Sequence, residues 1–273
     1  MTLRRPTIGV FDSGFGGLTV LKALLELIPE ADYAYFGDTA RLPYGSKSVE
    51  TVARYAVEAA HYLEGNGAAL LVIACNTATA LALDQIKAGA HVPVVGVVEP
   101  GAEAAASVSK NKKVVVVGTE ATVSSHAYRK ALALRGLEAR EKACPLLVPL
   151  VEEGWTEHPV TERVADIYLR EAFDDGFHEA DTLVLGCTHY PLIKPLLRRM
   201  APPHVSIVDS AESTARAVSG HLQNLLVPAL DEERRGRPRL KFFATDSVEK
   251  FRKLGERFLG HPIEEVEHVD LKE

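Results

Sequence analysis

The chain has 273 residues, of which 47% are hydrophobic, and its formal net charge is −6. This length predicts one large or two medium domains, and the negative charge argues against a general nucleic-acid-binding protein, which should be basic. Three cysteines without framework spacing are typical of the reducing cytoplasm. No apolar run is long enough for a signal peptide or a membrane span. We therefore expect a cytoplasmic protein with neither nucleic-acid nor membrane partners.

Short apolar runs alternate with helical patterns over the first hundred residues. Residues 8–11 predict a strand that enters a glycine-rich turn at 12–17, and leucines at helical spacing predict a helix over 18–27. The glycines allow the backbone to approach a ligand closely. The other strands expected in this half cover residues 32–36, 71–74 and 92–98.

The same alternation continues through the second half. A proline-bracketed extended piece is expected over 144–150, followed by a loop that carries Glu152. The strands expected in this half and beyond it cover residues 113–118, 183–186, 204–208 and 240–244. Strands that alternate with helices predict parallel sheets with helices on both faces.

The pattern predicts two similar parallel-sheet α/β domains related by pseudo-symmetry, with the active site between them. Residues 1–98 belong to the first domain and residues 99–207 form the second. The remaining residues, 208–273, are too few for a third α/β domain of ordinary size. We expect this C-terminal segment to return and complete the first domain.

Two stretches of the chain echo each other. Residues 71–77 read LVIACNT and residues 183–189 read LVLGCTH, so each apolar run ends in a cysteine followed by two polar residues. A thiol at the start of a helix has its thiolate form favoured by the helix dipole. Two such thiols, Cys75 and Cys187, on opposite sides of one carbon would allow one to remove a proton and the other to return one. This arrangement predicts stereoinversion by two bases.

Polar side chains follow most of the expected strands. In parallel α/β sheets, ligands bind outside the carboxyl ends of the strands, so these side chains are candidates for one common site. The candidates at strand ends are Asp12, Ser13, Tyr44, Gly45, Asn76, Thr77, Thr119, Thr122, Thr188 and His189, with Glu152 on a nearby loop. Hydroxyl, amide and backbone donors in this set suit a carboxylate ligand.

Several of these motifs together resemble the bacterial glutamate racemases of the aspartate/glutamate racemase family. The matching stretches are IGVFDSGFGGLTV (8–20), GDTARLPYG (37–45), VPLVE (148–152), LGCTHYP (185–191) and VDS (208–210), together with CNTA (75–78). They occur in the family's order, which makes the match specific. The segment near Thr119 departs from the family pattern, which is usually richer in glycine and threonine.

The resemblance implies a cofactor-independent isomerase that interconverts L- and D-glutamate and supplies D-glutamate for peptidoglycan synthesis. It implies that Cys75 and Cys187 are the paired acid/base residues, with Asp12, Glu152 and His189 as auxiliary ionisable residues. It implies substrate contacts from the strand-end residues named above. It also suggests a homodimer.

Three other functions are compatible with the same residues, and one of them is a ligand-binding module with no turnover. Another is a two-thiol racemase that acts on aspartate or another small acidic amino acid. The third is a thiol hydrolase or transferase that uses Cys187 with His189. A metal site is disfavoured because no close pair of ligands supports Cys187 and His189. Cys144 has no polar companion and is expected to be a buried structural residue.

Overall fold

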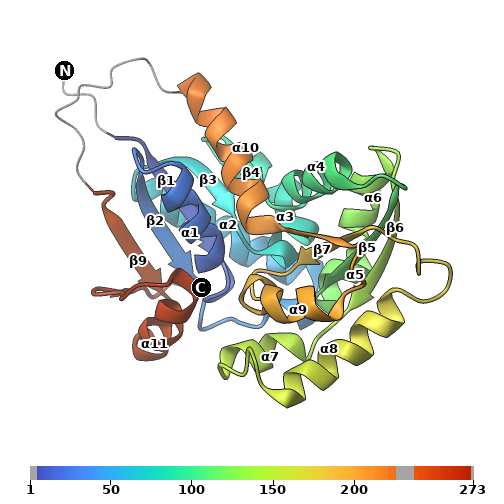
Figure 1. Ribbon diagram of the computed structural model, residues 1–273. Coiled ribbons are helices and arrows are strands. Elements are labelled where there is room, and N and C mark those ends of the chain that lie inside the picture. Colours follow the sequence, from blue (N-terminus) through green and yellow to red (C-terminus); the bar gives the residue numbers. More distant parts are fainter. Residues whose placement is uncertain (1–4, 226–236, 272–273) are drawn as a thin grey trace.

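Two separate sheets, each with helices on both faces, form the protein (Figure 1). The computed structural model describes residues 5–225 and 237–271. Every strand pairing in the two sheets is parallel, as the alternation of strands and helices predicts. The predicted α/β fold is therefore confirmed.

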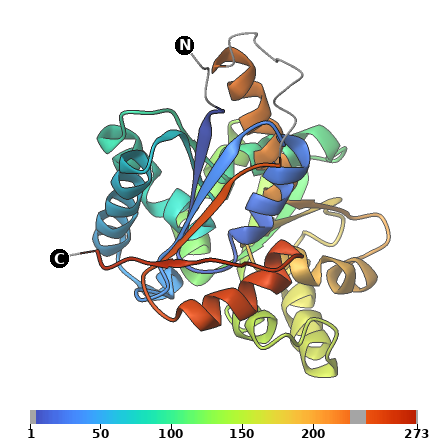
Figure 2. The ribbon, with the colours of Figure 1, turned by 90° about the vertical axis from the view of Figure 1, so that its left-hand side faces the viewer.

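The first sheet has six strands in the order β10-β9-β2-β1-β3-β4 and faces the viewer in Figure 2. Its strands are β1 (Thr7–Asp12), β2 (Asp32–Gly37), β3 (Ala68–Ile73), β4 (Val94–Gly96), β9 (Leu240–Ala244) and β10 (Glu267–His268). The second sheet has four strands in the order β6-β5-β7-β8. Its strands are β5 (Lys113–Gly118), β6 (Glu138–Ala143), β7 (Thr182–Gly186) and β8 (Ser206–Asp209).

The helices connect successive strands. Those of the first half are α1 (Leu18–Leu27), the 3₁₀ turn η1 (Tyr44–Ser46), α2 (Val49–Gly65), α3 (Asn76–Gly89) and α4 (Val98–Val108). Those that follow are α5 (Glu120–Ser125), α6 (Ala127–Ala133), α7 (Leu147–Glu152), α8 (Pro159–Ala172), η2 (Tyr190–Ile193), α9 (Lys194–Met200), α10 (Ser210–Leu225) and α11 (Val248–Leu259). In the described ranges, no helix is both long and apolar enough to cross a membrane.

The two sheets repeat one topology. In the first half of the chain, β2, β1, β3 and β4 lie side by side, and in the second half β6, β5, β7 and β8 lie in the same relative order. Because of this repeat, the loops after β3 and β7 are equivalent, and these are the loops that carry Cys75 and Cys187. The predicted pseudo-symmetry thus places the two thiols at matching strand ends.

The C-terminal segment extends the first sheet. Strand β9 pairs with β2, β10 pairs with β9, and α11 packs beside α1. The predicted segment 208–273 begins within β8, which is a strand of the second sheet, and its residues 226–236 and 272–273 lie outside the described ranges. The division of the chain into two domains at these boundaries stays a prediction.

Apolar side chains join the two halves into one core. One face of the first sheet packs against α1 and α11, and the same buried cluster continues without a break to α8 and the second sheet. Two smaller clusters lie beneath α2 and α3 on the first sheet and beneath α4 and α6 on the second. The strand ends of both sheets are therefore positioned by one continuous, closely packed core.

The region around Cys144 differs from the sequence prediction. Residues 144–150 do not form an extended piece, because the strand β6 ends at Ala143 and α7 begins at Leu147. Pro149 lies in the first turn of α7, where backbone N–H groups have no helical partner, so proline is tolerated there. The strand β6 was not predicted because this edge strand carries mainly polar side chains.

Candidate active site

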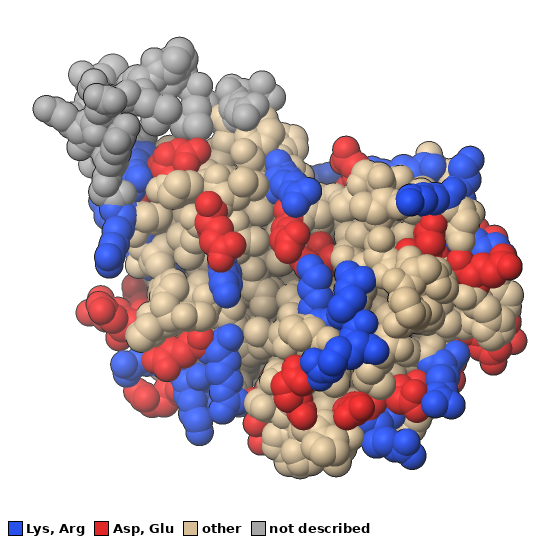
Figure 3. All heavy atoms as spheres, in the orientation of Figure 1, with Lys and Arg blue, Asp and Glu red and all other residues tan. Residues whose placement is uncertain are grey.

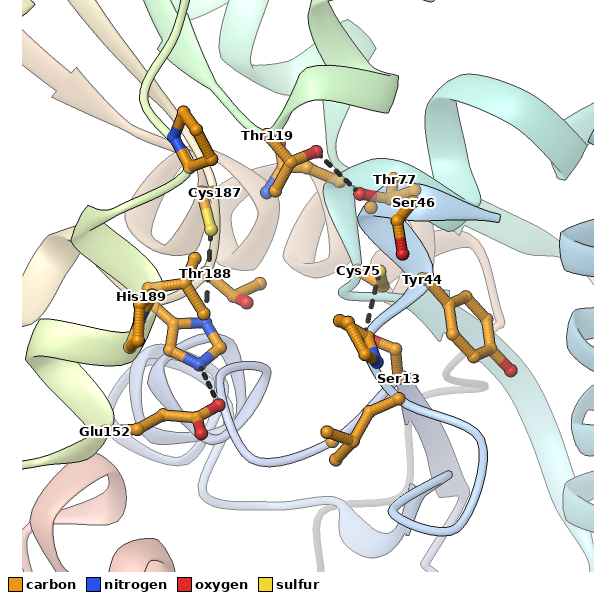
Figure 4. Close-up of a pocket in the computed structure, with 18 of the residues that line it drawn as sticks. Ser13, Tyr44, Ser46, Cys75, Thr77, Thr119, Glu152, Cys187, Thr188 and His189 are labelled. Carbon is orange, nitrogen blue, oxygen red and sulfur yellow. Dashed lines mark hydrogen bonds and ion pairs between the residues drawn. The ribbon is translucent and has the colours of Figure 1, made fainter. Parts of the chain in front are cut away.

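A cavity of about 390 Å³ lies between the carboxyl ends of the two sheets (Figure 4). It receives residues from the loops after β1, β2 and β3 of the first sheet and after β5, β6 and β7 of the second. The predicted site residues that line it are Ser13, Tyr44, Gly45, Cys75, Asn76, Thr77, Thr119, Glu152, Cys187, Thr188 and His189. Asp12 and Thr122 were predicted as well but do not line the cavity.

Cys75 is the N-cap of α3. Its Sγ accepts a hydrogen bond from the Ala78 N–H over 3.4 Å and lies 3.5 Å from Ser13 Oγ. The start of a helix favours a negative charge on this sulfur. Burial, followed by the negative charge of Asp12, nevertheless raises the pKa of the Cys75 thiol to about 12. In the free protein, Cys75 is therefore a thiol at neutral pH.

Cys187 has a different set of neighbours. Its Sγ lies 3.9 Å from His189 Nδ1, and His189 Nε2 lies 3.1 Å from Glu152 Oε1 (Figure 4). Burial alone would lower the pKa of His189, but its hydrogen bonds to Cys187 and Glu152 outweigh this effect and raise the pKa to about 10. The imidazolium form of His189 therefore lies between the sulfur and a carboxylate. This cation stabilises negative charge on Cys187.

Helix α11 supports this chain of ionisable groups from the other half of the molecule. The ring of Phe258 meets the imidazole of His189 edge to face, with 5.1 Å between the ring centroids. Arg257 Nη1 donates to the backbone carbonyl of Glu152 over 3.2 Å, and Lys250 Nζ lies 3.9 Å from Glu152 Oε2. No pattern in the sequence predicted these contacts, because they depend on how the C-terminal segment packs.

The glycine-rich turn approaches the second cysteine loop very closely. A Cβ atom built on Gly16 would lie 2.2 Å from Thr188 Oγ1 and 2.6 Å from His189 Nδ1. In addition, Thr19 Oγ1 donates to the backbone carbonyl of Thr188 over 3.0 Å. The turn after β1 therefore holds the Cys187 loop in place as well as lining the cavity.

Three threonine hydroxyls join the two halves beside the cavity. Thr77 Oγ1 lies 2.9 Å from Thr119 Oγ1 and 3.3 Å from Thr122 Oγ1, and the latter two lie 2.9 Å apart. Thr122 is fully buried, so it reaches the cavity only through its neighbours. Two of the predicted site residues, Thr119 and Thr122, thus lie in one hydrogen-bonded cluster.

Asp12 is buried next to the site. Its Oδ2 accepts a hydrogen bond from the Gly14 N–H over 2.9 Å, whereas its Oδ1 has no partner among the described residues. Burial raises the pKa of Asp12, and the positive charge of His189 acts in the opposite direction. Asp12 thus influences both Cys75 and His189 through its charge, although its side chain does not line the cavity.

Apolar side chains form part of the wall, and the sequence did not predict them. Leu42 and Pro43 come from the loop after β2, and Pro145, Val148 and Pro149 come from the segment after β6. These two loops occupy equivalent positions in the repeated topology. Apolar walls on two sides exclude water from a bound ligand and strengthen its electrostatic contacts.

Few of the described side chains that line the cavity are charged. Acidic and basic side chains are interspersed over the face seen in Figure 3. The cavity itself is lined by no lysine or arginine among the described residues, and its ionisable side chains are those of Tyr44, Cys75, Glu120, Glu152, Cys187 and His189.

In the described parts of the chain, no three His, Cys, Asp or Glu residues are grouped so that they could hold a metal ion. Cys144 is buried and lies outside the cavity lining.

The Glu152–His189 pair gives the protein a characteristic dependence of stability on pH. The folded-state pKa of His189 is raised, so its stabilising effect is complete below its ordinary value of 6.5 and is lost as pH rises through about 10. Burial raises the pKa of Glu152, but the hydrogen bond to His189 and the positive charges of His189 and Lys250 together outweigh burial and lower this pKa. The stabilising effect of Glu152 is therefore lost as pH falls below about 4.5. We expect Glu152→Gln to lower the free energy of unfolding by about 1.5–3 kcal/mol at pH 6 and by less at pH 9.5. Urea denaturation at both pH values measures this, and an equal loss at both would contradict it.

The two parallel sheets and the cavity between them are those of a racemase family. A family profile described as Asp/Glu/Hydantoin racemase matches residues 8–218, and the chain belongs to this family. The glutamate racemase of Koribacter versatilis is 60% identical, and the match covers 99% of both chains. A crystal structure of the glutamate racemase isoform RacE1 from Bacillus anthracis has a TM-score of 0.91 and 38% identity, and covers 98% of this chain and 99% of its own.

A third relative carries a ligand. The crystal structure of glutamate racemase from Francisella tularensis, in complex with D-glutamate, has a TM-score of 0.86 and 35% identity. The match covers 97% of each of the two chains. These relatives match almost the full length of the chain, so the similarity includes both sheets and the cavity between them.

Proposed function

We propose that this protein interconverts L- and D-glutamate without a cofactor, with Cys75 and Cys187 as its two acid/base groups. The observation that carries the proposal is the placement of two buried thiols at equivalent strand ends, on opposite sides of one cavity (Figure 4). The relatives named glutamate racemase support glutamate as the substrate.

The reaction needs one thiolate and one thiol at the start. The thiolate takes the α-proton from one face of the α-carbon, and the electron pair of the C–H bond remains on the substrate as a carbanion. The opposite thiol then gives its proton to the other face. The two cysteines have exchanged protonation states at the end, so the reverse reaction starts from the state that the forward reaction leaves.

The surroundings of the two sulfurs differ, because His189 faces Cys187, whereas Ser13 and the Ala78 N–H face Cys75. The imidazolium of His189 donates towards Cys187, while the pKa of Cys75 is raised to about 12 by its burial and by Asp12. When Cys75 accepts a proton from the substrate, the negative charge must first reside on it, and the N–H of Ala78 stabilises that state.

The carbanion requires further stabilisation. Amide and hydroxyl groups of Ser13, Asn76, Thr77 and Thr188 line the cavity and can donate to the substrate carboxylates. The thiols are only 5% and 4% exposed, so little water competes for their protons. Holding the thiolate beside the α-carbon supplies a further large contribution, of order 7–11 kcal/mol in favourable intramolecular systems.

The wider role follows from the same proposal. D-Glutamate made by this reaction would supply peptidoglycan synthesis, as the resemblance implies. We place the protein in the cytoplasm, because three cysteines without framework spacing are typical of a reducing compartment. We also expect a homodimer, as the resemblance to bacterial glutamate racemases implies.

Deuterium exchange tests the proposed reaction directly. Purified protein incubated with L-glutamate in D₂O should form D-glutamate that carries deuterium at the α-carbon, measured by mass spectrometry after chiral separation. Pyridoxal phosphate and chelators should have no effect on the rate. Racemisation of aspartate but not glutamate would support the acidic amino-acid alternative, and an absence of α-exchange with either would overturn the proposal.

A further inference from the structure

A buried tyrosine lies beneath the site, and the proposed function leaves its role unexplained. Tyr128 belongs to α6, next to the junction with α5, where His126 adopts a left-handed conformation with φ of 54°. This break turns the chain, and the Tyr128 side chain is fully buried between the second sheet and α4. Its ring therefore lies in the second half of the molecule.

Two glycines make room for this ring. A Cβ atom built on Gly101 would lie 3.1 Å from Cε1 of Tyr128, and one built on Gly186 would lie 3.0 Å from Cε2. These atoms are on opposite edges of the ring, at its hydroxyl end. Gly186 directly precedes Cys187, so the ring packs against the strand end that carries the second thiol. The hydroxyl is thereby held at a fixed point.

The hydroxyl reaches across to the first half. Tyr128 Oη donates to Asn76 Oδ1 over 2.7 Å, and Asn76 Nδ2 donates to Ser210 Oγ over 3.3 Å. Asn76 directly follows Cys75 and lines the cavity. One hydrogen of its amide nitrogen is thus used by Ser210, and the second is left for a ligand.

The orientation of the Asn76 amide depends on Tyr128. Burial raises the pKa of Tyr128, so the phenol keeps its proton. Within the described residues, Asn76 Oδ1 is the one acceptor that this proton reaches. If the amide turned over, the buried hydroxyl proton would lose its partner, which is energetically costly. The amide oxygen therefore faces Tyr128, and the amide nitrogen faces Ser210.

We infer that Tyr128 is a positioning residue, which fixes the Asn76 amide so that its N–H donates to a carboxylate of the bound amino acid. This inference rests on the proposed function, because it assumes that Asn76 binds the substrate. It also links the two cysteine loops, since one side chain packs under Gly186 and orients the residue beside Cys75.

The variant Tyr128→Phe tests this role, because it keeps the ring and removes the hydroxyl. We expect KM for glutamate to rise about tenfold, as for one lost buried hydrogen bond, with kcat little changed. Tyr33→Phe is the matched control, since Tyr33 is equally buried but donates to the carbonyls of Leu24 and Ile28, away from the cavity. It should leave KM unchanged while it also lowers stability.

A double-mutant cycle separates positioning from general destabilisation. If Tyr128 acts through Asn76, then Tyr128→Phe should have no further effect on KM in an Asn76→Ala background. An unchanged KM in the single variant, or the same rise in both backgrounds, would overturn the inference. Calorimetric glutamate binding to the Cys75→Ser/Cys187→Ser protein provides a second measure, in which Tyr128→Phe should weaken binding about tenfold. This measure still decides the role of Tyr128 if the wild-type protein proves not to racemise glutamate.

Discussion

Replacing either Cys75 or Cys187 with serine should lower kcat for glutamate racemisation by about 10²–10⁴-fold, the usual contribution of a positioned acid/base group. A serine hydroxyl is a far weaker acid than a thiol, so it neither forms the base nor readily gives up a proton at neutral pH. Either single change should suffice, because each turnover uses both groups. Polarimetry with L- and D-glutamate measures the rates.

Isotope exchange distinguishes the two variants from each other. The cysteine that remains in each variant faces only one side of the α-carbon. Residual exchange of the α-hydrogen with D₂O should therefore be confined to one enantiomer of glutamate in Cys75→Ser and to the other enantiomer in Cys187→Ser. This pattern would assign each thiol to one enantiomer.

Cys144→Ser is the matched control for both variants. Cys144 is also buried, but it lies outside the cavity, and its Sγ is 3.6 Å from the Lys142 carbonyl, which a serine hydroxyl could reach. It should keep the wild-type kcat. Full turnover by Cys75→Ser would instead contradict the two-base mechanism and support a hydrolase or transferase that uses Cys187 with His189.

Gly16→Ala should lower kcat/KM by about 10²-fold, the cost of a misplacement of about 1 Å at a reacting centre. The new methyl group would lie 2.2 Å from Thr188 Oγ1 and 2.6 Å from His189 Nδ1. The imidazole of His189 has little room to move away, because Glu152 holds its other nitrogen and the ring of Phe258 meets it edge to face. The Cys187 loop must therefore shift as a unit.

Gly220→Ala provides the comparison. A Cβ atom at Gly220, in helix α10, would meet no atom within 4 Å, so alanine should stabilise the protein by roughly 0.5–1 kcal/mol and leave kcat/KM unchanged. Steady-state kinetics and thermal unfolding of both variants measure these effects. Wild-type kcat/KM in Gly16→Ala would show that close packing of the turn against the Cys187 loop is not needed for activity.

The sequence was most informative where local pattern and chemistry coincide. Apolar runs that end in Cys75 and Cys187 predicted two equivalent strand ends, and the repeated order of β2-β1-β3-β4 and β6-β5-β7-β8 agrees with them. Most of the polar residues predicted at strand ends line the cavity, because parallel strands end at one edge of a sheet. These features need only short-range information.

Local sequence patterns did not predict the contacts between segments that are distant in the chain. The contacts of Phe258 with His189 and of Arg257 with Glu152 join α11 to segments at the edge of the second sheet. The hydrogen bond from Tyr128 to Asn76 likewise joins residues far apart in the chain. Amphipathic spacing predicts that a helix buries one face, but it does not say which loop that face meets. Asp12 shows the converse, since its position at the end of β1 did not reveal that it would lie outside the cavity lining.

The unequal neighbours of the two sulfurs have a kinetic consequence. L- and D-glutamate have the same free energy in water, so their equilibrium constant is one and kcat/KM must be equal in the two directions. The His189–Glu152 pair beside Cys187, absent beside Cys75, therefore cannot make the protein a better catalyst for one direction at low substrate. It can only raise or lower kcat and KM together for one enantiomer. The asymmetry thus sets which enantiomer saturates the protein first, and at saturation it decides the protonation form in which the protein accumulates.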